Sequence, residues 1–107
     1  MAFFELRHYQ TWPGKMKEWV NFMEQVIIPF QTARGMVIIG SFCSENEDSD
    51  YFWLRRFESE KEREYLYKAV YDSSGWSEDI FPKVGQLIDR SKVKVTRLVA
   101  TSRSMIR

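Results

Sequence analysis

Four short segments of this sequence are predicted to be β-strands: hydrophobic and polar positions alternate in the first and third, and the second is a short apolar, β-branched run. The segments are residues 3–10, 36–42, 51–57 and 92–99. After the first of them, apolar positions recur at three- and four-residue steps, a spacing typical of an amphipathic helix. This helix begins near Lys15 and ends at Gly35, a residue suited to a left-handed cap. We expect Pro29 to disturb its last turn.

The second helical connection is interrupted. Ser59 and Glu62 match a capping box, from which a helix runs to about Asp72. A Ser-Ser-Gly break at 73–75 follows, and then a third apolar stripe with helical spacing. Pro82 lies inside that stripe, so we expect either a kink or two short helices there.

The predicted order of elements is therefore β-α-β-β-α-β. Right-handed crossovers place the first and third strands at the centre of a four-stranded antiparallel sheet. This is an α+β fold of the ferredoxin-like type, with helices on one face of the sheet and the other face uncovered. The 107 residues allow one domain, and no linker or internal repeat divides residues 1–107.

Composition narrows the possible partners. The chain is 44% hydrophobic and 29% charged, which is ordinary for a folded domain. Its net charge of +1 provides no field to attract nucleic acid or anionic lipid, so we expect neither partner. No apolar run reaches the ~20 residues of a membrane span. The single cysteine, Cys43, excludes an internal disulfide and favours a reducing, cytoplasmic location.

The usual signals of metal or cofactor chemistry are weak. One histidine and one cysteine cannot build a common zinc site, and the acidic loop at 44–50 lacks EF-hand spacing. We therefore expect no metal and no cofactor, and interpret the loop as a solvated hairpin tip. Tyr65, Tyr67 and Tyr71 share a helix with several basic residues. We interpret them as the edge of an amphipathic helix with its hydroxyls in water, and not as a nucleic-acid surface.

The alternation of the two central strands assigns their side chains to faces. We expect four apolar positions, together with the neighbouring His8, to face the helices: Phe4, Leu6, Phe52 and Leu54. Six others would then lie on the uncovered face: Glu5, Arg7, Tyr9, Trp53, Arg55 and Phe57. Exposed aromatic rings and charges without partners are unfavourable there. A second copy packed sheet against sheet would cover them, so we expect a homodimer through this face.

Three stretches resemble proteins of the NIPSNAP family. They are Phe-Glu-Leu-Arg at 4–7 with the Pro-Gly-Lys that follows at 13–15, Trp-x-Arg-Arg-Phe at 53–57, and Thr-x-Arg-Ser at 101–104. The resemblance extends over nearly the whole chain. It implies a dimeric α+β barrel, in which two ferredoxin-like sheets enclose a shared interior, and it implies little about chemistry. His8 stands where the family pattern has a small polar residue.

The six side chains of the uncovered face are the candidate site. They could be a buried ion-pair network that fixes the register of the dimer. Alternatively, they could line a pocket in which Arg7 and Arg55 bind a carboxylate or enolate and Tyr9 donates a hydrogen bond. Glu5 could act as a base if burial raises its pKa.

Two classes of function stay open. The first is a homodimer of unknown biochemical role that binds a small apolar or anionic molecule. The second is an enzyme of the α+β barrel type: a cofactor-independent monooxygenase, an isomerase or a haem-handling enzyme. Fold analogy alone does not decide between them.

Overall fold

A computed structural model describes residues 1–46 and 49–107, in which four strands form one antiparallel sheet. Their bounds are β1 (Phe3–Gln10), β2 (Val37–Cys43), β3 (Asp50–Phe57) and β4 (Lys94–Leu98). The sheet order is β2-β3-β1-β4, so β1 and β3 are central and β2 is an edge strand, as the sequence predicts. Glu47 and Asp48 of the expected acidic loop lie outside the described residues.

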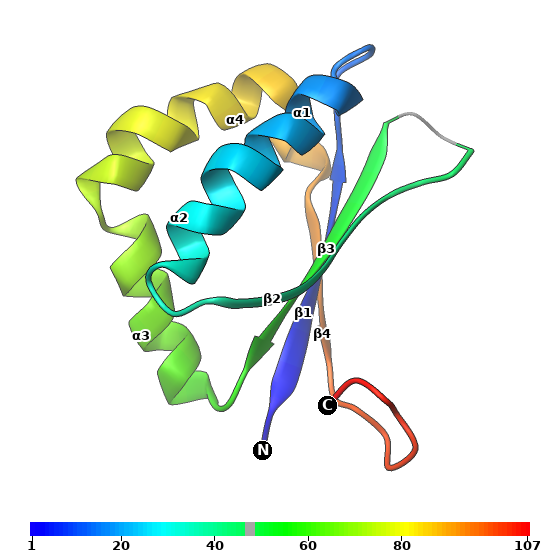
Figure 1. The fold of residues 1–107 in the computed structure, drawn as a ribbon, viewed down its shortest axis with the longest axis vertical. Helices are drawn as coiled ribbons and strands as arrows, with labels where there is room; N and C mark the ends of the chain where they lie inside the picture. The colour runs from blue at the N-terminus through cyan, green and yellow to red at the C-terminus, as the bar shows by residue number, and fades with distance from the viewer. Residues whose placement is uncertain (47–48) are drawn as a thin grey trace.

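The helices all lie on one side of this sheet, which confirms the ferredoxin-like α+β fold (Figure 1). The first connection holds α1 (Met16–Phe22), the π-helical segment η1 (Met23–Ile27) and α2 (Ile28–Thr32). The second holds α3 (Glu60–Tyr71), the π-helical segment η2 (Gly75–Ile80), α4 (Phe81–Leu87) and the 3₁₀ turn η3 (Arg90–Lys92). No helix among the described residues is both long and apolar enough to cross a membrane.

Both prolines within the helices lie where a π-helical segment gives way to an α-helix. Pro29 is in the first turn of α2, and Pro82 is in the first turn of α4. Because proline has no N–H to donate, the regular hydrogen-bond ladder is interrupted at these points. The expected disturbances are therefore confirmed. Gly35, with a φ of +103°, confirms the expected left-handed end of the first connection.

The start of α3 follows the predicted capping pattern. The Ser59 side chain accepts a hydrogen bond from the Glu62 backbone N–H at 3.1 Å. The Glu62 carboxylate in turn accepts one from the backbone N–H of Glu58 at 3.0 Å. These bonds satisfy backbone donors that the first turn of a helix would leave free. They fix where α3 leaves the sheet.

The two faces of the sheet are the reverse of those expected. Tyr9, Tyr51 and Trp53 pack against α1 and η1, while Phe3 and Phe57 pack against α3. The six candidate residues therefore lie beneath the helices and not on the uncovered face: Glu5, Arg7, Tyr9, Trp53, Arg55 and Phe57. The residues expected against the helices lie on the open face: Phe4, Leu6, His8, Phe52 and Leu54.

The assignment was reversed because alternation shows only that the two faces of a strand differ, and not which of them the helices cover. Charged positions at Glu5 and Arg55 suggested an outer face, although both side chains are fully buried. The large aromatic rings on the same parity have the most apolar area to bury, and the helices cover them. Burial of the rings, together with pairing of the charges, decides the orientation of the strands.

Candidate functional site

A buried ion pair links the two central strands. Arg55 Nη2 on β3 donates to Glu5 Oε1 on β1 at 2.9 Å, and both side chains are 0% exposed. Arg63 on α3 approaches the other carboxylate oxygen, with Nε 2.6 Å from Oε2. Glu5 therefore pairs with Arg55, one of its two predicted partners, and with Arg63, which was expected only among the basic residues of the second helix.

Two tyrosines of α3 complete this network. The Tyr67 hydroxyl donates to Glu5 Oε1 at 2.6 Å and accepts from Arg55 Nη2 at 2.8 Å. The Tyr71 hydroxyl accepts from Arg55 Nη1 at 2.8 Å. The interpretation of these hydroxyls as solvated is therefore wrong, although Tyr65 is 70% exposed. The four-residue step from residue 63 to 67 to 71 puts all three side chains on one face of α3.

The surroundings of Glu5 keep it ionised. Burial acts to raise its pKa, but hydrogen bonds from Tyr67 and Arg63 and the charges of Arg55 and Arg63 outweigh burial and lower the pKa below 4.5. The condition under which Glu5 would be a base is a raised pKa, and that condition is not met. Burial also raises the pKa of Tyr67, to about 12, so its hydroxyl stays protonated as a donor.

Arg7 is placed differently from Arg55. Its Nε donates to the Tyr9 hydroxyl at 2.8 Å, and its Nη1 lies 3.4 Å from the Tyr67 hydroxyl. In the described part of the chain, no carboxylate lies within salt-bridge distance of it. Burial opposes its charge, but the oxygens of Tyr9, Tyr71 and Tyr67 raise the pKa of Arg7 above its ordinary value. The guanidinium is charged and partly buried, and it has no counter-ion among these residues.

Arg7 borders a cleft of about 300 Å³ between the sheet and the helices. The floor consists of Arg7, Tyr9 and Trp53 from the two central strands. One wall comes from α1 and η1, through Trp19, Met23 and Ile27. The π-helical segment η1 thus supplies two of these three wall residues. Such segments occur often at functional sites.

The opposite wall and the rim come from the second connection. Tyr71, Trp76 and Phe81 present aromatic rings to the cleft, and Arg90 lies at its edge. The Arg90 guanidinium lies 4.5 Å from the centroid of the exposed Phe81 ring. None of the described lining residues carries a carboxylate. The cleft is therefore apolar and aromatic, with two positive charges.

Three of the six predicted site residues line the cleft, namely Arg7, Tyr9 and Trp53. Glu5 and Arg55 lie in the ion-pair network next to it, and Phe57 packs in the cluster beneath α3. Arg55 joins the two regions, because its guanidinium lies 4.7 Å from the centroid of the Trp53 ring. Four further lining residues could not be placed in the cleft from the sequence, because their convergence depends on how the helices pack: Trp19, Tyr71, Trp76 and Arg90.

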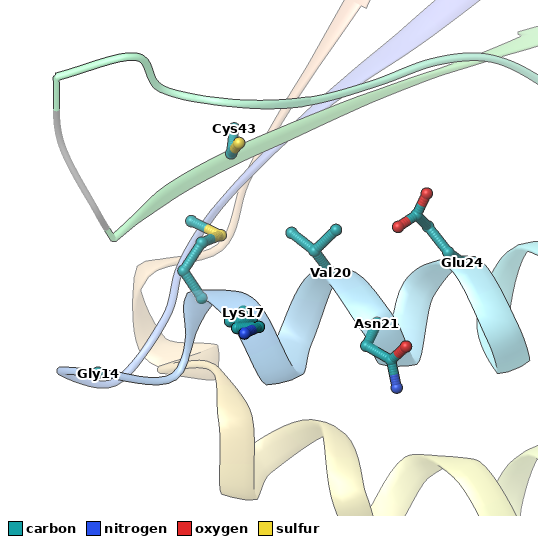
Figure 2. A pocket seen from close by; sticks show the side chains of 7 residues that line it. Gly14, Lys17, Val20, Asn21, Glu24 and Cys43 are labelled. Carbon is teal, nitrogen blue, oxygen red and sulfur yellow. The ribbon is translucent and has the colours of Figure 1, made fainter.

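A larger and more open hollow lies between α1 and the end of β2 (Figure 2). Figure 2 shows Val20 of α1 and Glu24 of η1 on the side that faces β2 and Cys43, whereas Asn21 points away from the strand. The volume of this hollow is about 650 Å³, but Lys17, Asn21 and Glu24 are exposed and Cys43 is an exposed free thiol. Water competes for these polar groups, so the enclosed aromatic cleft is the candidate site.

His8 lies on the other side of the sheet from the cleft. Its Nε2 is 2.7 Å from Asp50 Oδ1, and its ring stacks on Phe52 with the centroids 4.4 Å apart. The expectation that His8 faces the helices is therefore wrong. Its only described polar side-chain partner is a strand neighbour, so it takes no part in the cleft.

Solved structures with the same architecture were found by comparison. A NIPSNAP family protein from Agrobacterium tumefaciens has a TM-score of 0.89 and 21% identity, with 100% of each chain covered. An uncharacterised NIPSNAP-like domain protein from Burkholderia xenovorans has a TM-score of 0.85 and 19% identity, covering 96% of this chain and 88% of that one. A mutant of SnoaB, a cofactor-independent oxygenase from Streptomyces nogalater, has a TM-score of 0.68 and 10% identity, covering 99% and 98%.

The sheet order and the single helical layer define a ferredoxin-like α+β protein with a cleft between its two layers. A family model described as NIPSNAP matches residues 4–103. The chain belongs to the NIPSNAP family. The search of curated proteins found no match.

We expect acid to destabilise the protein through Glu5. Its pKa is lowered in the folded state, so its contribution to stability is present above the ordinary value of 4.5 and is lost as pH falls below that value. Glu5→Gln should reduce the free energy of unfolding at neutral pH by about 3–5 kcal/mol, because it removes the counter-charge of buried Arg55. It should also flatten the loss of stability at acidic pH. Urea unfolding at several pH values measures both effects.

Glu64→Gln is the matched control, since Glu64 is an exposed residue of the same α3 and makes no ion pair among the described residues. Its free energy of unfolding should change by less than ~0.5 kcal/mol, and its acid profile should follow the wild type. Equal acid slopes for the wild type and Glu5→Gln would contradict the assigned role of Glu5.

Proposed function

We propose that this protein binds a small planar molecule with a negative charge, in the cleft between the sheet and the helices of a single chain. The observation that carries the proposal is Arg7: a charged, partly buried guanidinium without a carboxylate partner among the described residues, at the floor of an aromatic cavity. A buried charge normally has a counter-ion. An anionic ligand would supply it.

The walls favour the planar part of such a ligand. Trp53, Trp19 and Trp76 contribute large ring surfaces, which stack on flat molecules and exclude water. A cavity of about 300 Å³ is at the lower end of the range for small-molecule sites, so one or two fused rings would fill it. Arg90 at the rim adds a second positive charge where the anion would enter.

We expect 2-naphthoate to bind at least about tenfold more tightly than its neutral methyl ester, because only the carboxylate can form an ion pair with Arg7. Quenching of tryptophan fluorescence measures both affinities, since three of the four tryptophans line the cleft. Arg7→Met keeps the aliphatic stem and should abolish the preference for the anion. Arg103→Met, in the exposed tail, is the control and should retain it. Equal affinity for acid and ester in the wild type, or no saturable quenching by either, would overturn the proposal.

Cofactor-independent oxygenation is a second candidate, supported by the likeness in fold to SnoaB. A cleft that stabilises an anion and excludes water suits a substrate whose deprotonated form itself transfers electrons to O₂, without a cofactor. One oxygen atom would enter an activated CH₂ carbon as a carbonyl, and the two hydrogens would leave with the other oxygen atom as water. No described residue of the cleft specifically favours an isomerase or a haem-handling enzyme.

Oxygen uptake distinguishes this candidate from simple binding. With anthrone as substrate, we expect a wild-type oxygenase to consume one O₂ per molecule of quinone formed, well above the rate in buffer. Arg7→Met should slow this reaction, and Arg103→Met should not. An unchanged background rate with wild-type protein, under conditions in which anthrone binds, would exclude this reaction for anthrone.

We also infer a homodimer formed through the open face of the sheet. The side chains of this face differ from those first expected, but they favour association more strongly because they are mostly apolar. Phe42, Val37 and Leu98 are 57%, 46% and 40% exposed. The strand register places them on the face of Phe4 and Leu54, opposite the helices. A two-fold axis would bury this face against its copy, as the NIPSNAP resemblance implies.

We expect light scattering at micromolar concentration to give twice the chain mass of 12.8 kDa. Phe42→Asp should shift the protein towards the monomer, because it would bury a charge in the interface. Tyr65→Asp is the control: Tyr65 is 70% exposed, at least as open to water as Phe42, but it lies on α3, away from the open face. A wild-type mass of 12.8 kDa would contradict the dimer. Since the exposed free thiol of Cys43 suits a reducing compartment, we propose that this dimer is cytoplasmic.

A further inference from the structure

Two tryptophans that line the cleft carry indole N–H donors without acceptors among the described residues. Nε1 of Trp19 and Nε1 of Trp53 are both buried, and neither has a hydrogen-bond partner in the described part of the chain. Both residues line the cleft. Buried N–H groups are nearly always paired in folded proteins. Each of these two lining residues therefore carries an N–H group that no described residue satisfies.

Two tyrosine hydroxyls of the lining are also donors without an acceptor in the part of the chain that the structure describes. The Tyr9 oxygen accepts from Arg7 Nε at 2.8 Å. The Tyr71 oxygen accepts from Arg55 Nη1 at 2.8 Å and from Gln31 Nε2 at 3.4 Å. Neither hydroxyl hydrogen meets an acceptor within residues 1–46 and 49–107. Because each oxygen already accepts from a guanidinium, its own O–H is a stronger donor and its remaining accepting capacity is weak.

Arg7 can offer only part of its guanidinium. A carboxylate is bound best when two parallel N–H groups meet its two oxygens. Nε of Arg7 is already committed to Tyr9, which removes the Nε–Nη2 edge from such a pair. Nη1 lies 3.4 Å from the Tyr67 hydroxyl, so one of its N–H groups is engaged as well. The lining also offers the single O–H groups of Tyr9 and Tyr71. This arrangement suits an anion whose charge rests mainly on one oxygen.

We propose that the cleft binds phenols and enols in their deprotonated form, as phenolates or enolates, in preference to carboxylates and to the protonated molecules. This inference rests on the proposed function, because it concerns the same cleft and narrows the class of its ligand. A protonated phenol would bury an O–H that needs an acceptor, and the tyrosine oxygens of the lining already accept from cations or amides. The proton leaves to water, since no described lining residue has a carboxylate or an imidazole to receive it.

The test uses 4-nitrophenol, whose phenolate absorbs visible light and whose phenol does not. The wild-type protein is titrated into the probe at a pH where most of the free probe is protonated. Tryptophan quenching reports how much probe is bound, and visible absorbance reports how much of it is ionised. We expect the ratio of phenolate to phenol to be about tenfold higher on the protein than in buffer, as a cation within a few ångströms would produce.

Two variants test the source of this effect. Arg7→Met should bring the ratio close to that in buffer, because the nearest charge is gone. Tyr71→Phe should lower it by about two- to threefold, because one neutral donor is lost. Arg103→Met, which changes an exposed charge of the tail, should behave as the wild type. The melting temperature of each variant shows whether it is folded. Should either cleft variant fail to fold, the wild-type measurement still decides.

Each outcome in the wild type has a distinct meaning. Saturable binding with an unchanged ratio of phenolate to phenol overturns this inference and leaves the proposed binding function intact. A lower dissociation constant for 4-nitrobenzoate than for 4-nitrophenolate, each measured by tryptophan quenching at the same alkaline pH, overturns the preference for one-oxygen anions. Absence of saturable quenching by 4-nitrophenol, with 2-naphthoate still bound, overturns the inference alone. Absence of binding by both overturns the proposed function as well.

Discussion

The carboxylate of Glu5 sets the main constraint on this fold, because it lies in the sheet beneath the helices with no access to water. A buried carboxylate is tolerated only when charged and polar groups surround it. Arg55, Arg63 and Tyr67 meet this requirement, and they come from β3 and α3. Apolar contacts alone would let α3 slide along the sheet at little cost. Directional bonds to one carboxylate permit a single position.

The same network divides the arginines of the site into two kinds. Arg55 forms an ion pair with Glu5, and aromatic rings surround its guanidinium. The centroid of the Trp53 ring lies 4.7 Å from the guanidinium carbon. Arg7 shares the Tyr67 hydroxyl with this network but has no carboxylate of its own among the described residues. The structural and the ligand-binding interpretations of the site therefore do not compete. The first describes Glu5 and Arg55, and the second describes Arg7.

The sequence was sufficient for the elements and their order. Changes of period located the strands and helices, the capping residues located the start of α3, and the two prolines located the breaks in the helices. Right-handed crossovers then left one sheet order. The face of the sheet that the helices cover could not be predicted from the sequence in the same way. A strand with a buried ion pair carries charge on its inner face, and simple alternation assigns that charge to the outside.

The number of aromatic residues on each of the two alternating faces of the strands was a better indicator of the covered face. Phe3 and Tyr9 on β1 share a face with Glu5, and Tyr51, Trp53 and Phe57 on β3 share it with Arg55. Counting all of them would have favoured this face as the covered one. The cleft itself was less accessible, since Trp19, Trp76 and Arg90 approach it from separate helical segments. Only tertiary packing brings them together.

The corrected orientation places ligand binding and assembly on opposite faces of one sheet. The face beneath the helices holds the charges and rings that a small molecule could use. The open face holds apolar side chains that a second copy could cover. Each protomer of the proposed dimer would then keep a complete cleft, built only from its own residues. A substitution on the open face could change the assembly without touching Arg7 or its neighbours. The two central strands, β1 and β3, carry side chains of both faces and so lie between the cleft and the proposed interface.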